Sequence, residues 1–498
     1  MNNSLVDCLI EILNTEGINY CHWKSNIDLD QAISGDMDLD FLVDRESYLQ
    51  VLAILSRLGF KSATARWGEN TPGIAHYYGY DLDSDRFAHV HLFSRVLTGE
   101  SSIKSHLLPF HKMLLSNTRY ERNVKVPSKA AELVIFTIRT YVKYGSMLDL
   151  LYLVKKKEKV KSELAWLKDG GDLEKSIGLL KEFSPSIDEK LFVDCITTLE
   201  TDGSLVRRIR LARKLRGQIR HFSKQNSFEK LLSFFRLIGT QLQRRIGSGS
   251  KNKIMLAGGT LIAIVGADAS GKSTVVSETG RWLSKSLLVR IIHAGKPPTS
   301  LATAPINILL HLSRSFWPKR QQMVKANLLS SDHENSSTGK RGTASLLYAF
   351  RAVALAWDRK NLLLKSWRAA AKGEIIICDR YPSNNLGAMD SPRLKENLLD
   401  VGWQSPIINL TARLEQRLYR QIPPPDLVIR LQVSMETAKE RNRLRIKPRG
   451  ETDDYIEFRH KNAAEWNRSD AARVFDIDTG QPLSLTLQEI KSLIWRSL

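Results

Sequence analysis

The sequence has little cysteine, with four in 498 residues. Cys8, Cys21, Cys195 and Cys378 lie far apart, and no pair has the Cys-x-x-Cys spacing. This pattern indicates neither a disulfide framework nor a cysteine-based zinc site. Scattered, unpaired cysteines are typical of a reducing compartment, so we expect a cytoplasmic protein.

Long apolar runs are also missing. No stretch approaches the roughly 20 apolar residues that a membrane span requires. The first residues, MNNSLVDCLIEIL, have no basic stretch before the apolar positions and include Asp7 and Glu11, which is unlike a signal peptide. We therefore expect neither a membrane span nor a secretory leader.

Acidic residues are fewer than basic ones. The chain has 74 Lys and Arg against 53 Asp and Glu, a formal net charge of +21. Such an excess favours anionic partners, among them nucleotides, nucleic acid, phosphosugars and lipid surfaces. The content of 42% apolar and 26% charged residues is that of a globular protein, and the chain is too long for one hydrophobic core. We expect two or three domains.

The texture of the sequence divides it into three regions. Residues 1–125 alternate helical and strand-like patterns, which predicts a small α/β or α+β domain, and the pattern of residues 126–247 predicts helices. A Gly/Ser-rich hinge follows at 246–253. In residues 258–498, apolar runs such as TLIAIV and EIIICD alternate with helical segments, which predicts a parallel sheet covered by helices on both faces.

The segment LIAIVGADASGKSTVV has the spacing of a phosphate-binding loop, Gly-x-x-x-x-Gly-Lys-Ser. A strand pattern precedes it and a helical pattern follows, so loop N–H groups and a helix N-terminus would converge on phosphate oxygens. Lys272 would reach the β and γ phosphates, and the Ser273 hydroxyl would bind Mg²⁺. The predicted ATP-binding residues are Gly266, Ala267, Asp268, Ala269, Ser270, Gly271, Lys272, Ser273 and Thr274.

Two further segments fit phosphoryl transfer. IIICDRYP predicts a strand that delivers Asp379 to the magnesium end of the phosphate site, with Arg380 facing the transferred phosphoryl group or the acceptor phosphate. A basic segment lies between Arg441 and Arg449, where mobile cations could close over the γ-phosphate oxygens as a lid. Together with Lys272, Asp379 and Arg380, the predicted catalytic residues are Arg443 and Arg445.

Residues 258–498 resemble the thymidylate kinase family of P-loop nucleoside monophosphate kinases. The resemblance rests on GADASGKST, on CDRYPSNNLG, on PPPDLVIRLQVSMETAKERNRLR and on VFDIDTGQPLSLTLQEI. It implies a P-loop kinase fold, ATP with Mg²⁺, a phosphorylated small-molecule acceptor and a homodimer, and it implies that Asp268 binds the sugar hydroxyl of the acceptor nucleotide.

The acceptor itself stays open, because the chain departs from the family at several positions. Ala269 replaces a second glycine of the loop, and HAGKPPTS stands where the family has Arg-Glu-Pro-Gly, so that only Lys296 could replace the arginine. Lysine does not reproduce a bidentate guanidinium clamp. Arg359 lies near the sequence position at which the family has an arginine that binds the acceptor phosphate. The acceptor could be a nucleoside monophosphate, a phosphosugar or another small phosphorylated or hydroxylated molecule.

The N-terminal region has a signal of its own. CHWKSN followed by SGDMDLDFLVD resembles the nucleotidyltransferase-like superfamily, which implies metal binding by Asp38 and Asp40 on one side of a strand. The strand expected to supply a third carboxylate, FAHVHLF, offers His89 and His91 instead, and hard Mg²⁺ prefers oxygen. Asp81 or Asp83 could compensate. An active metal site, a degenerate nucleotide-recognition site and a purely structural turn are the three interpretations.

The helical middle region has a strong excess of basic residues. Between Ser204 and Ser250 there are twelve Lys or Arg and one acid, Glu229. The helix expected from Arg207 to Arg220 could contact anionic lipid or nucleic acid, or it could dock on the protein with a solvated basic face.

Taken together, the sequence predicts an α/β enzyme, an ATP-dependent phosphotransferase with an N-terminal nucleotidyltransferase-like domain and a helical middle region. One alternative is a nucleotidyltransferase whose P-loop domain senses or supplies nucleotide. Another is a nucleotide-gated binding module.

Overall fold

We describe the chain from a computed structural model. The residues described are 4–66, 71–99, 104–143, 157–201, 204–224, 229, 239, 252–300, 303–305, 341–383, 390–394, 405–444, 466–468 and 470–498. Most of the predicted hinge and Arg445 of the predicted lid lie outside them.

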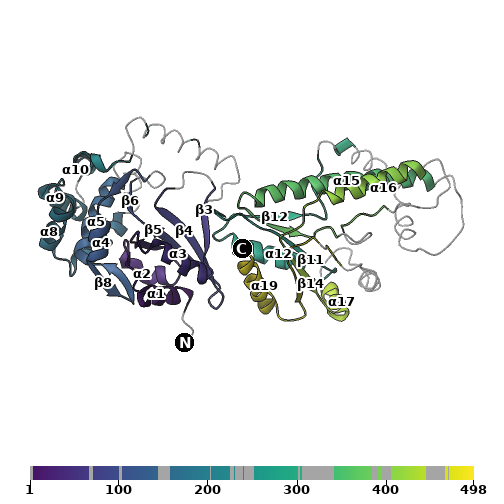
Figure 1. The fold of residues 1–498 in the computed structure, drawn as a ribbon, viewed down its shortest axis with the longest axis horizontal. Coiled ribbons are helices and arrows are strands. Elements are labelled where there is room, and N and C mark those ends of the chain that lie inside the picture. Colours follow the sequence, from purple (N-terminus) through teal and green to yellow (C-terminus); the bar gives the residue numbers. More distant parts are fainter. Residues whose placement is uncertain are drawn as a thin grey trace. The chain divides into compact units, whose positions relative to one another are not determined.

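The chain divides into two compact units, Met1–Ala257 and Gly258–Leu498. Each unit has its own sheet and its own hydrophobic cores. The colours of Figure 1 run from purple to teal in the first unit and from teal through green to yellow in the second.

The first unit is built on a six-stranded sheet in the order β1-β2-β5-β4-β3-β10. Strands β2 and β5 are parallel, and every other neighbouring pair is antiparallel. The strand bounds are β1 (Tyr20–His22), β2 (Leu39–Val43), β3 (Lys61–Ala65), β4 (Ile74–Asp81), β5 (Arg86–Phe93) and β10 (Lys253–Met255). Two hairpins lie outside this sheet, β6 (Val96–Thr98) with β7 (His106–Leu108) and β8 (Thr118–Glu121) with β9 (Val124–Pro127).

Helices cover both faces of this sheet because side chains alternate along its strands. Leu39, Phe41 and Val43 of β2 pack in one core with α1 (Leu5–Thr15), α2 (Leu29–Ile33) and α3 (Tyr48–Arg57). Leu42 and Phe93 face the opposite core, which is built mainly from later helices. These are α4 (His111–Ser116), α5 (Lys129–Lys143), α7 (Lys157–Lys168), α8 (Leu173–Phe183), α9 (Glu189–Glu200) and α10 (Leu205–Gln218). The 3₁₀ helices are η1 (Asn26–Asp28) and η2 (Arg220–Phe222).

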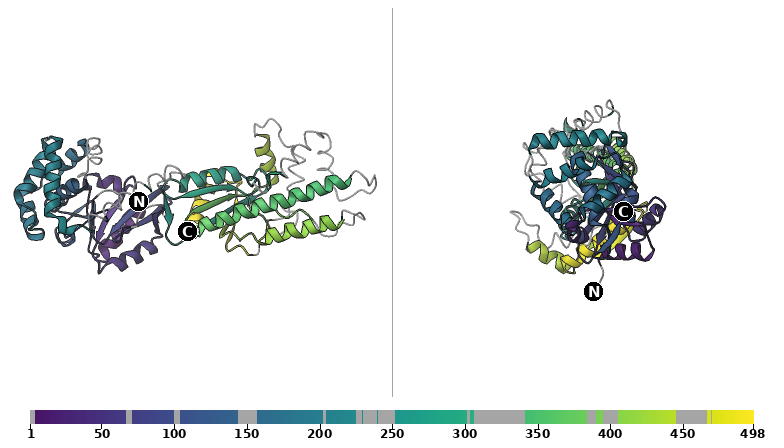
Figure 2. Two further views of the ribbon diagram at one scale, coloured as in Figure 1. Left: turned by 90° about the horizontal axis from the view of Figure 1, so that it is seen from above. Right: turned by 90° about the vertical axis from the view of Figure 1, so that its left-hand side faces the viewer.

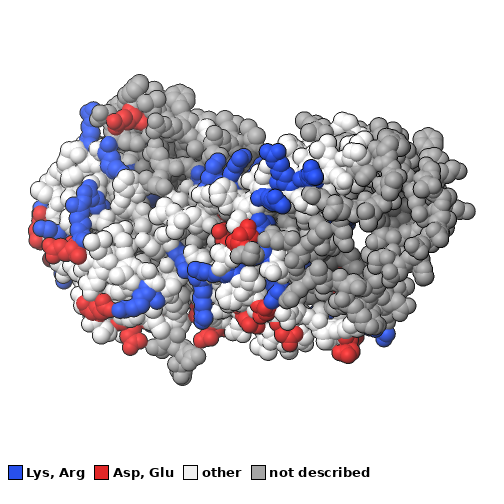
Figure 3. All heavy atoms as spheres, turned by 45° about the vertical axis from the view of Figure 1, so that its right-hand side comes forward, with Lys and Arg blue, Asp and Glu red and all other residues white. Residues whose placement is uncertain are grey.

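The basic helix predicted from Arg207 to Arg220 corresponds to α10, and its apolar side chains are buried inside the protein. Leu211, Leu215 and Ile219 are buried in the core shared with α5 and α9, while Arg210 and Arg213 are exposed. A contact of this helix with lipid or nucleic acid would therefore be electrostatic, without insertion of an apolar face. On the face drawn in Figure 3, the described Lys and Arg side chains are interspersed with Asp and Glu.

The second unit is built on a five-stranded, fully parallel sheet in the order β12-β13-β11-β14-β15. The bounds are β11 (Leu261–Gly266), β12 (Val289–His293), β13 (Ile375–Asp379), β14 (Leu427–Gln432) and β15 (Val474–Asp478). Strand β11 and the first four residues of β13 are continuous apolar runs, and β14 is apolar except for Arg430 and Gln432, as expected for strands that are buried on both faces.

Helices cover both faces of the parallel sheet, as the sequence predicted. The pair α15 (Arg341–Ala370) and α16 (Ser405–Arg420) lies side by side over one face, and α12 (Lys272–Leu283) with α19 (Leu483–Ser497) covers the other (Figures 1 and 2). Helix α17 (Met435–Arg443) follows β14. In the part of the chain that the structure describes, no helix is long and apolar enough to cross a bilayer.

Candidate functional site

The predicted phosphate loop lies between β11 and α12, at the carboxyl end of the central strand. Its backbone takes the left-handed region at Gly266 (φ +152°), Ala269 (φ +65°) and Gly271 (φ +87°). A Cβ at Gly266 would lie 2.5 Å from the carbonyl oxygen of Leu431. Only glycine fits that position, because β14 approaches the loop so closely.

Ala269 occupies the position where the sequence departs from the family's glycine. Its Cβ packs against Ala438 of α17, with Val433 beside it. The methyl group offsets part of the cost of a left-handed backbone and attaches the loop to α17.

Lys272 and Ser273 begin α12. The Lys272 side chain is buried against its own loop, and Nζ donates to the carbonyl oxygens of Gly266, at 3.0 Å, and of Ala267. Ser273 and Thr274 are exposed at the helix N-terminus, where the helix dipole favours an anion. The loop, the ammonium group and these hydroxyls thus lie together at one end of the sheet.

Asp379 is the last residue of β13, next to this loop. In the sheet it lies beside Ile264 of β11 and His293 of β12. His293 Nδ1 is 3.5 Å from Asp379 Oδ2, while Oδ1 is buried without a hydrogen-bond partner among the described residues. A buried carboxylate oxygen without a donor fits a cation ligand, since leaving it unpaired is costly. The donor set of Asp379 and the Ser273 hydroxyl is suited to Mg²⁺.

Arg380 is held beside the loop by two carboxylates. Its guanidinium lies 3.9 Å from Asp268 and 3.5 Å from Asp390, and its backbone is left-handed (φ +72°). A non-glycine residue in that conformation costs free energy, which the surrounding contacts offset. The structure thus brings Asp268, Asp379 and Arg380 together with the phosphate loop.

Arg359 has a structural position, which corrects its reading as a candidate for the acceptor phosphate. The side chain is fully buried, and it donates to the carbonyls of Ala294 and Gly295, to Asp390 and to the Tyr419 hydroxyl. It fixes the position of the turn after β12 and of Asp390, which in turn contacts Arg380. Arg359 is therefore a positioning residue one step removed from the site, whereas Lys296 is exposed.

In the predicted lid, the structure brings a different arginine to the loop. Arg441 of α17 donates to the Thr479 carbonyl after β15, and its Nη1 would be 4.0 Å from a Cβ at Gly271. Arg443, one of the two residues predicted here, is exposed at the end of α17. The other, Arg445, lies outside the described residues.

In the first unit, Asp38 and Asp40 lie on the same side of β2, and histidines from the parallel strand β5 contact both. His89 Nδ1 is 2.7 Å from Asp38, and His91 Nδ1 is 3.1 Å from Asp40. Lys24 also contacts Asp40, at 2.8 Å. Burial would raise the pKa of Asp40, but Lys24 and His91 outweigh it and hold the pKa below the usual range. The Lys24 ammonium group thus already contacts the Asp40 carboxylate, which was predicted to bind metal.

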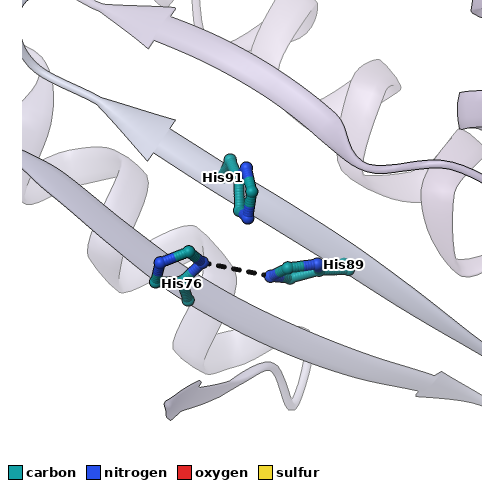
Figure 4. Close-up of side chains that lie close together, drawn as sticks. All are labelled: His76, His89 and His91. Carbon is teal, nitrogen blue, oxygen red and sulfur yellow. Dashed lines mark hydrogen bonds between the residues drawn. The ribbon is translucent and has the colours of Figure 1, made fainter. Parts of the chain in front are cut away.

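A third histidine, His76 of β4, completes a cluster with His89 and His91. In the antiparallel pairing of β4 with β5, His76 lies opposite His91, and Figure 4 shows the three rings gathered over these strands. His76 Nδ1 is 3.2 Å from His89 Nε2, and Tyr78 stacks on His89. Burial, with the nearby His91 and Lys253, lowers the pKa of His76 to about 2, so the ring is neutral at neutral pH.

The carboxylates suggested as substitutes, Asp81 and Asp83, lie at the β4–β5 turn. Asp81 accepts from the Asp83 backbone N–H at 3.1 Å and from Ser84 at 2.9 Å. Asp81 lies five positions beyond His76 along β4, about 17 Å away at the rise of a strand. These two residues form the turn and do not reach the cluster.

Sequence reasoning missed His76, Asp390 and the contact of Lys24 with Asp40. His76 was within reach of a register argument: a short turn at 82–85 pairs the strands on either side, which places His76 opposite His91. Asp390 and Lys24 left no such signal, because their contacts depend on tertiary packing.

Comparison with known proteins gives partial likenesses. No family model matches the sequence. The "Uncharacterized ATP-binding protein YghR" of Escherichia coli K12 is 24% identical over 244 residues, which is 47% of this chain and 86% of that protein. The "Uncharacterized ATP-binding protein YghS" of the same strain is 28% identical over 182 residues, 36% of this chain and 71% of that protein.

Two solved structures are similar to part of the chain. Deoxyadenosine kinase from M. mycoides with bound dATP has 18% identity and a TM-score of 0.26, covering 47% of this chain and 98% of that one. Thymidylate kinase from Candida albicans has 20% identity and a TM-score of 0.27, covering 48% and 94%. Neither likeness identifies a substrate for this chain.

Proposed function

We propose that the chain is an ATP-dependent phosphotransferase of the nucleotide-kinase type. The observation that supports this most strongly is the phosphate loop with Lys272, directly beside an Asp379 oxygen that has no hydrogen-bond partner in the described residues. The name of YghR, an ATP-binding protein, also supports the donor.

The residues divide the work of phosphoryl transfer between them. Loop N–H groups and the N-terminus of α12 bind the phosphates, and the Lys272 ammonium turns from the loop carbonyls to phosphate oxygens. Ser273 and Asp379 would hold Mg²⁺, which neutralises charge on the phosphate oxygens when bound. No general base is required, because positioning and charge stabilisation supply most of the acceleration.

The acceptor end of the site is formed by Arg380. Its guanidinium lies between Asp268 and Asp390, so it is oriented before a substrate arrives. A fixed guanidinium recognises a phosphate by paired hydrogen bonds. The acceptor we propose is therefore a nucleoside monophosphate or another small phosphorylated molecule.

The test is ADP formation with ATP and Mg²⁺ across nucleoside monophosphates, phosphosugars and a reaction without acceptor. One acceptor class should stimulate turnover, and Lys272→Ala should reduce it by about 100-fold or more. Lys285→Ala, an exposed lysine after α12, is the matched control and should keep wild-type turnover. Equal turnover in the two variants, or no stimulation by any acceptor, would contradict the proposal.

Nucleotidyl transfer by the first unit is a second candidate function. It is favoured by two carboxylates on one side of β2 with a parallel neighbour, β5. The Lys24 contact with Asp40 and the histidines of β5 weigh against it. Asp40→Asn alongside Lys272→Ala separates the two: turnover abolished only by Asp40→Asn would place the chemistry in the first unit.

A further inference from the structure

The second site in this chain is the histidine cluster of the first unit. We propose that His76, His89 and His91 bind one divalent transition-metal ion of the zinc class. This proposal is independent of phosphoryl transfer and concerns a different unit of the chain.

The spacing of the rings matches the demands of such an ion. One ligand nitrogen from each histidine can be chosen so that all three lie within 4.8 Å of one another. His76 Nδ1 and His89 Nε2 are 3.2 Å apart. Two nitrogens bound to zinc at tetrahedral geometry are about 3.3 Å apart, so this pair can bind one ion with little movement.

Two carboxylates orient the rings from behind. Asp38 lies at Nδ1 of His89 and Asp40 at Nδ1 of His91, so the ion would bind Nε2 of each ring. Asp38 Oδ2 lies 3.7 Å from His91 Nε2, which is beyond hydrogen-bond distance. A carboxylate that accepts from the far nitrogen of a metal-binding histidine fixes the tautomer and increases ligand basicity. Both β5 histidines have this arrangement.

The ligand chemistry selects against Mg²⁺. Imidazole suits zinc, nickel, cobalt and copper, whereas magnesium prefers oxygen and keeps its waters. Of the nearby carboxylates, Asp40 is paired with Lys24 and Asp38 with His89. The cluster offers three imidazole nitrogens, whereas the two nearby carboxylates already contact Lys24, His89 or His91.

All three histidines are partly exposed, and the side chains of His89 and His91 are 15% and 19% exposed. Three protein ligands leave a fourth tetrahedral position for water or a substrate atom, which is the arrangement of zinc sites that bind a small molecule.

Lys253 of β10 should weaken metal binding. Its Nζ lies 3.4 Å from Nε2 of His76. When His76 binds a metal through Nδ1, its Nε2 bears the proton and cannot accept from Lys253, and the ammonium also repels the ion. Removal of this charge should strengthen metal binding several-fold.

The experiment uses the full chain without a histidine tag, treated with chelator and titrated with zinc against a chromophoric competitor. Wild type should bind one zinc per chain, and a millimolar excess of Mg²⁺ should not displace it, because Mg²⁺ prefers oxygen ligands. His76→Asn with His91→Asn should weaken binding by about 100-fold or more. The matched control is His111→Asn, at an exposed histidine that begins α4.

Two further measurements distinguish loss of the metal site from misfolding of a variant. Cobalt bound to wild type should give the strong visible absorption of a tetrahedral site without a thiolate band, since its ligands are nitrogens. Lys253→Met should tighten zinc binding while retaining the wild-type circular dichroism spectrum. Zinc bound equally by wild type and the double variant, or no zinc bound by a folded wild type, would overturn the proposal.

Discussion

At the scale of single residues, Arg359 shows how a buried charge can organise a site without touching substrate. Its guanidinium links the turn after β12, Asp390 and Tyr419, and Asp390 in turn contacts Arg380. Removal of a buried guanidinium group of this kind costs free energy, because each of its hydrogen-bond partners is left buried and unsatisfied.

We expect Arg359→Met to lower the free energy of unfolding of the second unit by about 3 kcal/mol or more. Arg368→Met, at an exposed arginine of the same helix, should change it by less than about 0.5 kcal/mol. Urea denaturation followed by circular dichroism measures both. A variant of unchanged stability with a raised KM for the acceptor would return Arg359 to the role of a phosphate ligand.

Glu132 of α5 is a second buried residue with a measurable consequence. It is 1% exposed, accepts from the Asn26 backbone N–H through Oε1, and has no partner for Oε2 among the described residues. Burial raises the pKa of Glu132 to about 7 from an ordinary value of 4.5.

The sign of the pH effect follows from proton binding. Between about pH 4.5 and 7 the folded state holds more protons on Glu132 than the unfolded state, so stability from this group falls as pH rises. Glu132→Gln, which mimics the protonated acid, should gain up to about 3 kcal/mol over wild type between pH 5 and pH 8. The exposed Glu158→Gln should gain nothing over the same interval. A difference that is constant with pH would contradict the buried, protonated glutamate.

The sequence could predict those residues whose roles follow from spacing along the chain. The phosphate loop, Lys272 and Asp379 meet in space because each follows a strand of one parallel sheet, and the ends of such strands are neighbours. Arg359 and Asp390 could not be assigned, because their contacts come from α15, α16 and a turn far apart in sequence.

At the scale of elements, the sheets were easier to predict than the pairing of their strands. The apolar runs of β11 and β13 and the mostly apolar sequence of β14 predict buried parallel strands, and the structure has them. The His76 cluster depended on the register of β4 with β5, where a slip of one residue would turn every side chain to the other face.

Two glycines in different elements predict opposite effects of the same substitution. Gly178 is exposed within α8, and a Cβ there would meet nothing within 4 Å. Gly259 precedes β11, where a Cβ would lie 1.9 Å from the Glu374 carbonyl oxygen. We expect Gly178→Ala to stabilise the first unit by about 0.5–1 kcal/mol and Gly259→Ala to destabilise the second by about 2 kcal/mol or more. Thermal denaturation of each variant measures the two effects, and two shifts of the same sign would contradict the packing described around Gly259.

At the scale of the whole molecule, the helices of the middle region belong to the first unit. Helices α5, α7, α8, α9 and α10 share one core with Cys21, Leu42 and Phe93 of the sheet. Strand β10, which follows the Gly/Ser-rich segment in sequence, pairs with β3 of that same sheet. The sequence pattern distinguishes the helical region from the mixed region before it. It does not show that the two regions share a core, because that depends on which faces of the helices and of the sheet pack together.

Because each unit has its own core, ligands should act on them separately. Mg²⁺-ATP at 100 times its Kd should stabilise the second unit by about 2.7 kcal/mol, and zinc should stabilise the first in the same manner. We expect calorimetry to show two unfolding transitions, one raised by Mg²⁺-ATP and the other by zinc. Lys272→Ala should abolish only the first shift, and His76→Asn with His91→Asn only the second. A single transition raised by either ligand would instead mean that the two units unfold together and that binding in one is coupled to the stability of the other.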